Sequence, residues 1–152
     1  AYPDLFVAVG VHSGVPRGDI RSLRAALAAM QGKAGAMPTA RLPRQLPTIV
    51  FHGDQDKVVH PSNAGGFLHN LERAGMGPLT LRSLPGKSDG GRDFSRRVYQ
   101  DRLGTVLLED WTIHGSGHSW SGGNPMASHT DPAGPDASRE MLRFFLARRR
   151  HS

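Results

Sequence analysis

Three short segments of the chain are almost continuously apolar, and each is followed by a cluster of turn residues. They are residues 6–11, 47–53 and 105–113. Apolar runs of this length, rich in Val, Ile and Leu, are typical of β-strands that are buried on both faces of a parallel sheet. The pattern therefore predicts three parallel strands.

Apolar residues at helical spacing lie between and after these strands. A proline at a helix start, glycines after helix ends and Asp136 as an N-cap mark the boundaries. The helices predicted in this way span residues 20–30, 61–75 and 136–146. Strands that alternate with helices favour an α/β fold, with a mostly parallel sheet flanked by helices.

The remaining segments do not show the pattern of a buried strand or an amphipathic helix. Residues 94–100 precede the third strand across a short polar turn, so they are predicted to form a hairpin onto it. Residues 32–47, 83–93 and 114–135 are predicted to be loops. The last of these is long, and loops of that length in compact domains are usually functional or disordered.

Composition narrows the classes of protein that remain. The chain has 152 residues, no cysteine and a formal net charge of +6. The lack of cysteine excludes a thiol nucleophile, a disulfide framework and Cys-bound zinc. The longest apolar runs have six to nine residues, far below the roughly 20 that a membrane helix needs. The 16 arginines are spread along the chain, which favours a solvated surface over a nucleic-acid interface.

Candidate catalytic side chains follow two of the predicted strands. Asp56 comes after the second strand, and His118 comes after the third. Because the carboxyl ends of parallel strands meet at one edge of a sheet, we expect both side chains at the same edge. An acid that orients a histidine is the second half of a Ser-His-Asp triad. No G-x-S-x-G nucleophile motif lies between a predicted strand and a helix, so the serine has no counterpart here.

Three blocks of sequence resemble a known family. They are AYPDLFVAVGVHSGVP at 1–16, PTIVFHGDQDKVVHP at 47–61 and GSGHSWSGG at 115–123. In this order they resemble the poly(3-hydroxybutyrate) depolymerase-type esterases, which are related to feruloyl and acetylxylan esterases of the α/β-hydrolase superfamily. The resemblance implies that residues 1–152 are the C-terminal part of one α/β-hydrolase domain, with the nucleophile elbow on an upstream segment.

The resemblance also implies roles for individual residues. Asp56 falls on the family's catalytic acid and His118 on its catalytic base, with Trp120 beside the base. The expected substrates are carboxylic esters such as hydroxyalkanoate oligomers or feruloyl and acetyl esters, and no cofactor is implied. The chain alone is expected to be inactive. The first strand would be an open sheet edge, which predicts either the upstream half or a second copy of the chain as its partner.

Other interpretations of the same residues stay open. Asp56 could brace its own loop through backbone N–H groups, and Asp54 in the same turn competes for the acid's role. Trp120 could line a substrate pocket or only pack the loop. His114 and His118 could bind a metal, although a third ligand is not evident. The whole chain could instead be a non-enzymatic basic module that binds an anionic partner.

Overall fold

The computed structural model describes residues 5–16, 22–33 and 45–148 of the chain. Residues 1–4, which begin the first of the three resembling blocks, lie outside this part. The elements are β1 (Val9–His12), α1 (Leu23–Met30), β2 (Thr48–Gly53), α2 (Asn63–Arg73), β3 (Thr80–Lys87), β4 (Asp93–Gln100), β5 (Val106–Ile113), β6 (Trp120–Ser121), β7 (Thr130–Asp131) and α3 (Ala137–Leu146).

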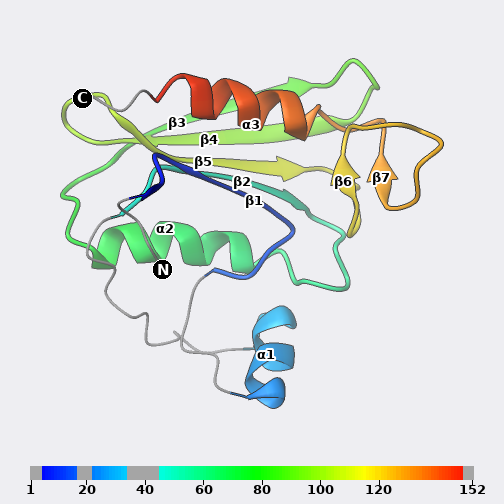
Figure 1. Cartoon of the computed structure of the whole chain (residues 1–152), viewed down its shortest axis with the longest axis horizontal. Coiled ribbons are helices and arrows are strands. Elements are labelled where there is room, and N and C mark those ends of the chain that lie inside the picture. The colour runs from blue at the N-terminus through cyan, green and yellow to red at the C-terminus, as the bar shows by residue number, and fades with distance from the viewer. Residues whose placement is uncertain (1–4, 17–21, 34–44, 149–152) are drawn as a thin grey trace.

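Three of the five strands in the main sheet are parallel, as the apolar runs predict. The sheet has the order β1-β2-β5-β4-β3, and β2 pairs in parallel with β1 on one side and with β5 on the other. The carboxyl ends of β1, β2 and β5 therefore lie at the same edge of the sheet (Figure 1). The loops that leave this edge hold the candidate catalytic residues.

The other half of the sheet is antiparallel, and it corrects the predicted fold class. β4 pairs antiparallel with β5, which confirms the predicted hairpin, and β3 adds a further antiparallel strand outside β4. Residues 80–87 are thus a strand, although 83–93 was predicted to be a loop. The prediction of the C-terminal half of an α/β-hydrolase fold, with a mostly parallel sheet flanked by helices, is wrong. The sheet is mixed, its antiparallel ladders are the longest, and the three helices of the described residues are short.

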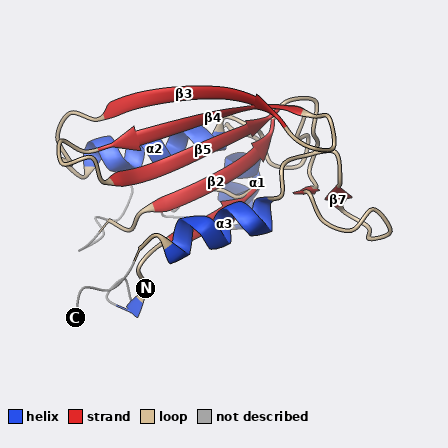
Figure 2. Ribbon diagram, turned by 90° about the horizontal axis from the view of Figure 1, so that it is seen from above, coloured by secondary structure: helices blue, strands red, loops and turns tan. Residues whose placement is uncertain are grey.

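Side chains that alternate along the central strands form two separate cores. On one face, Ile49 and Phe51 of β2 and Trp111 of β5 pack against Phe144 of α3. On the opposite face, the intervening side chains pack against α2. Figure 2 shows α2 and α3 on either side of the strands. Because β2 is buried on both faces, its carboxyl end is a fixed platform for the loop that follows it.

Helix boundaries follow the sequence signals best at α3, whereas α1 begins at Leu23 after its N-cap Ser22, and the predicted start at residue 20 lies outside the described residues. Asp136 caps α3 as predicted, and its carboxylate accepts a hydrogen bond from the backbone N–H of Arg139 at 3.0 Å. Within the described residues, no helix has the length and apolar character needed to cross a membrane.

Candidate active site

The loops after β2 and β5 are tied together by backbone hydrogen bonds. The N–H of Asp54 donates to the carbonyl of Ile113 at 3.1 Å, and the N–H of Gln55 donates to the carbonyl of Ser116 at 3.0 Å. A Cβ on Gly53 would lie 2.3 Å from that Ser116 oxygen, so only glycine allows the loops to approach this closely. The side chains on the two loops are consequently held in one fixed arrangement.

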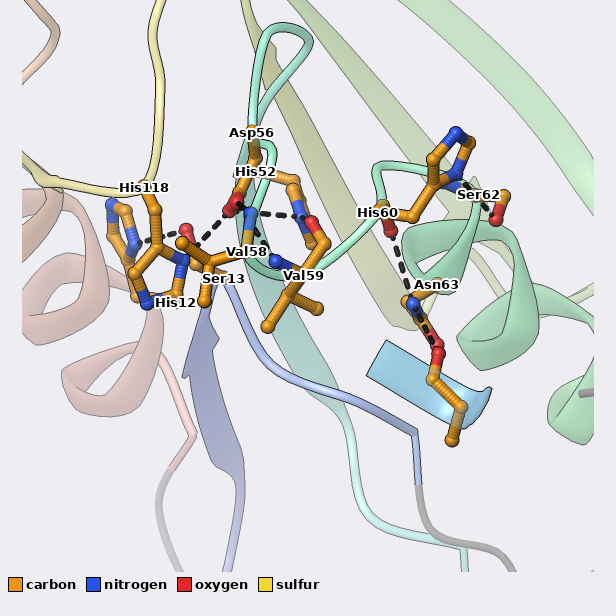
Figure 3. Close-up of polar contacts among 11 residues, drawn as sticks. His12, Ser13, His52, Asp56, Val58, Val59, His60, Ser62, Asn63 and His118 are labelled. Carbon is orange, nitrogen blue, oxygen red and sulfur yellow. Dashed lines mark hydrogen bonds and ion pairs between the residues drawn. The ribbon is translucent and has the colours of Figure 1, made fainter. Parts of the chain in front are cut away.

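Asp56 and His118 meet across these loops, as the sequence predicts. His118 Nδ1 lies 2.8 Å from Asp56 Oδ2. The other carboxylate oxygen accepts the backbone N–H groups of Val58 and Val59, both at 2.9 Å. The Asp56 side chain is completely buried, whereas that of His118 is 41% exposed. Asp56 therefore both braces its own loop and contacts Nδ1 of His118, so bracing the loop does not exclude a role as the acid (Figure 3).

The contacts of Asp56 fix the proton positions on His118. Burial raises the pKa of Asp56, but the hydrogen bonds from His118 and the two backbone amides outweigh burial and leave the pKa below its ordinary value. The carboxylate is then ionised at neutral pH and can only accept hydrogen bonds, so Nδ1 of neutral His118 carries the proton. Nε2 is left as the basic nitrogen, and it makes no hydrogen bond to any described residue.

His52 supports the acid from the opposite side. Its Nε2 donates to the carbonyl of Val59 at 2.8 Å and lies 3.4 Å from Asp56 Oδ2. In Figure 3, Asp56 lies between His52 and His118. The bond to Val59 is local, because the two residues lie seven positions apart in the chain. The contact with Asp56 is an additional finding.

His12, at the end of β1, is a site residue that sequence reasoning missed. Its Nε2 accepts the backbone N–H of Ser121 at 2.9 Å, so its Nδ1 carries the proton and donates to Ser13 Oγ at 3.2 Å. Burial, and secondarily the charges of His52 and His118, lower the pKa of His12 from 6.5 to about 4. The rule that parallel strands end at one edge would have placed His12 here, because β1 is parallel to β2.

Trp120 lies over His12 rather than over His118. The two rings stack with centroids 4.8 Å apart and planes 22° apart, and Trp120 Nε1 donates to Ser138 Oγ at 3.2 Å. The side chain is 38% exposed. The indole thus packs against His12, and part of its surface is open to solvent beside the site.

A second acid–histidine pair lies on the same two loops. Asp54, the competitor for the acid's role, pairs with His114 rather than with His118, and Asp54 Oδ2 lies 3.0 Å from His114 Nδ1. His114 and His118 therefore each contact a different carboxylate. Over the described ranges 5–16, 22–33 and 45–148, no cluster of three or more His, Cys, Asp or Glu side chains could hold a metal ion.

The spacing G-x-S-x-G does occur once, at Gly86–Gly90, and the structure assigns its serine a different role. Ser88 lies in the turn between the antiparallel strands β3 and β4, not between a strand and a helix. Its Oγ lies 2.5 Å from the carbonyl oxygen of Ala133 and accepts the backbone N–H of Arg92 at 3.0 Å. Ser88 therefore ties the hairpin to the segment before α3, and it makes no hydrogen bond to His118.

Comparison with known proteins assigns no family to this arrangement. No protein-family model matches the chain, and no curated protein sequence matches it.

Proposed function

We propose that this chain supplies the acid and the base of a serine esterase that cleaves carboxylic esters. The observation that carries the proposal is the Asp56–His118 pair, in which a buried carboxylate holds Nδ1 and leaves Nε2 open. A histidine in this tautomer can take a proton from a serine hydroxyl, which is its role in a Ser-His-Asp triad. The pair is present although the sheet is mixed rather than mostly parallel.

The reaction would divide its steps between these side chains and a serine from an upstream segment. The serine oxygen attacks the ester carbonyl while His118 Nε2 takes its proton, and His118 then returns the proton to the leaving alcohol. Asp56 keeps Nδ1 protonated and stabilises the imidazolium that forms. Because Asp56 is completely buried, solvent does not compete for this hydrogen bond.

The edge of the sheet offers a place for the missing serine. Among the described residues, β1 is an edge strand, and the side chains of its first residue, Val9, and of Phe6 before it are exposed. A further parallel strand next to β1 would end at the same sheet edge as His12. Only β1 would then lie between this strand and β2, the strand that Asp56 follows. An upstream strand paired there would therefore bring the residue that follows it close to His118. Trp120, with its exposed edge beside His12, is the proposed contact for the acyl or alcohol group of the substrate.

The test joins this chain to its upstream segment and measures ester hydrolysis. The 152 residues are expressed together with the polypeptide encoded immediately before them, and hydrolysis of p-nitrophenyl esters of increasing acyl length is followed. Replacing His118 by Ala should lower kcat/KM by at least about 10³-fold, and Asp56→Asn should lower it by about 10³–10⁴-fold because Nδ1 loses its acceptor.

The matched control is His69→Ala, which removes an exposed histidine on α2, away from the two loops. It should leave kcat/KM unchanged. Circular dichroism of each variant separates a loss of fold from a loss of catalysis. Unchanged hydrolysis in folded His118→Ala would show that this histidine is not the base.

A further inference from the structure

A serine completes the second acid–histidine pair. Ser95, near the start of β4, places its Oγ 2.8 Å from Nε2 of His114, whose Nδ1 lies 3.0 Å from Asp54 Oδ2. The three residues come from the ends of β4, β5 and β2, which are neighbours in the sheet. Ser95 lies opposite Thr112 in the register of β4 and β5, so the antiparallel hairpin brings it beside His114.

The hydrogen bonds assign a direction to this row of three side chains. Asp54 also accepts the backbone N–H of Gly115 at 2.7 Å. Burial raises the pKa of Asp54, but the hydrogen bonds from His114 and Gly115 outweigh it and leave the pKa below its ordinary value. The ionised carboxylate accepts a hydrogen bond from Nδ1 of neutral His114, so Nδ1 carries the proton and Nε2 is an acceptor. The hydroxyl of Ser95 must donate to Nε2, which is the order of donors and acceptors in a Ser-His-Asp relay.

We propose that Ser95 is a nucleophile activated by His114 and Asp54, and that it forms a second ester-reactive site distinct from the Asp56–His118 pair. Ser95 Oγ forms a bond to the carbonyl carbon while its proton passes to His114 Nε2. The bond to the leaving alcohol then breaks, and the alcohol departs with the proton from His114. Water, activated in the same way by His114, hydrolyses the acyl-serine and returns Ser95 to its starting state.

The surroundings of Ser95 define which esters it can use. The side chains of His114 and Asp54 are 44% and 32% exposed, so the site is open to solvent. Ser95 pairs with Pro85 on one side and Thr112 on the other, and its backbone lies within the sheet. Backbone amides that take part in a ladder are not free to bind an oxyanion. We therefore assign activated acyl donors with good leaving groups to this site, because such donors need the least stabilisation of an oxyanion.

Covalent labelling of the intact 152-residue chain tests the proposal directly. The chain is treated with a fluorophosphonate, in which attack by the serine oxygen forms an O–P bond and releases fluoride, and labelled peptides are quantified by mass spectrometry. We expect Ser95 to be labelled at least about 10²-fold faster than Ser83, an exposed serine on the neighbouring strand β3. This result would replace the expectation that the chain alone is inert.

Variants identify the source of the reactivity. His114→Gln and Asp54→Asn should each slow labelling of the Ser95 peptide by about 10²-fold, because each removes the path for the proton. His69→Gln, on the exposed face of α2, should leave the labelling rate unchanged. Because the readout is the modified Ser95 peptide itself, failure here is independent of any result for His118.

A measurement that needs no reaction tests the proton positions. Imidazole ¹⁵N chemical shifts should show His114 with its proton on Nδ1, and Ser95→Ala should shift the Nε2 resonance. Labelling of Ser95 at the same rate as Ser83, or a proton on Nε2 of His114 at neutral pH, would overturn the proposal.

Discussion

The two acid–histidine pairs lie on the same two loops, yet they differ in what surrounds them. Asp56 is completely buried and accepts two backbone amides besides His118. Asp54 is 32% exposed and accepts one backbone amide besides His114. At Nε2 the second pair has the additional contact. Nε2 of His114 bonds to Ser95, whereas Nε2 of His118 has no partner among the described residues.

This difference separates two requirements of a catalytic relay. A buried, fully hydrogen-bonded carboxylate fixes its histidine strongly, because few other positions satisfy its oxygens. A nucleophile at Nε2 supplies the reacting atom. The first pair meets the first requirement and the second pair meets the second, so the molecule allows each requirement to be tested by itself.

Removing the two carboxylates should give the largest contrast in stability. Asp56→Ala leaves the amides of Val58 and Val59 without their acceptor, and we expect it to lower the free energy of unfolding by about 3–4 kcal/mol. Asp54→Ala removes a partly exposed carboxylate, and we expect a loss of about 1 kcal/mol. Urea unfolding at pH 7 measures both. Equal losses would contradict the contrast between a buried and an exposed acid.

Mild acidification, from pH 7 to pH 4.5, should weaken the site around the first pair through His12. His12 has a pKa of about 4 in the folded chain and 6.5 as its ordinary value, so the unfolded state binds more protons between these pH values. Stability is therefore fully present above pH 6.5 and is lost as the pH falls toward 4. The difference between these two pKa values corresponds to about 3 kcal/mol at most.

The variant His12→Gln isolates this effect. Its unfolding free energy should fall less than that of the unsubstituted chain between pH 7 and pH 4.5. Asp54 and Asp56 do not contribute in this window, because their pKa values lie below 3.8 in the folded chain and their stabilisation is lost only at lower pH. An identical pH dependence in both proteins would show that His12 is not held in its neutral form.

The sequence anticipates the parallel half of the sheet and the first pair for the same reason. Continuous apolar runs correctly identify β2 and β5 as buried strands, whereas β1 is exposed or only partly buried. The shared carboxyl edge of the parallel strands predicts where Asp56 and His118 meet. The sequence pattern does not predict β3, because Pro85 and Gly86 within it are typical of turns. Pro85 is tolerated there because, within the described residues, β3 is an edge strand.

The second site could not be found from the sequence for a related reason. Ser95 reaches His114 only because β4 pairs antiparallel with β5 in one register, and a shift of one residue would turn Ser95 to the other face. Local patterns predict the hairpin but not its register. The sequence likewise does not predict the partner of Asp54, which follows β2 in the same turn as Asp56 and contacts His114.

The smallest expected effect is spectroscopic, and it distinguishes the two histidines directly. In the intact chain, Ser95→Ala should shift the ¹⁵N resonance of His114 Nε2, because that nitrogen loses a hydrogen-bond donor. The resonances of His118 should not move, since His118 is bonded to Asp56 and not to Ser95. Asp56→Asn should give the converse result, with a change at His118 and none at His114. A shift of both histidines in either variant would mean that the tied loops transmit the change, and the two pairs would then be one coupled site.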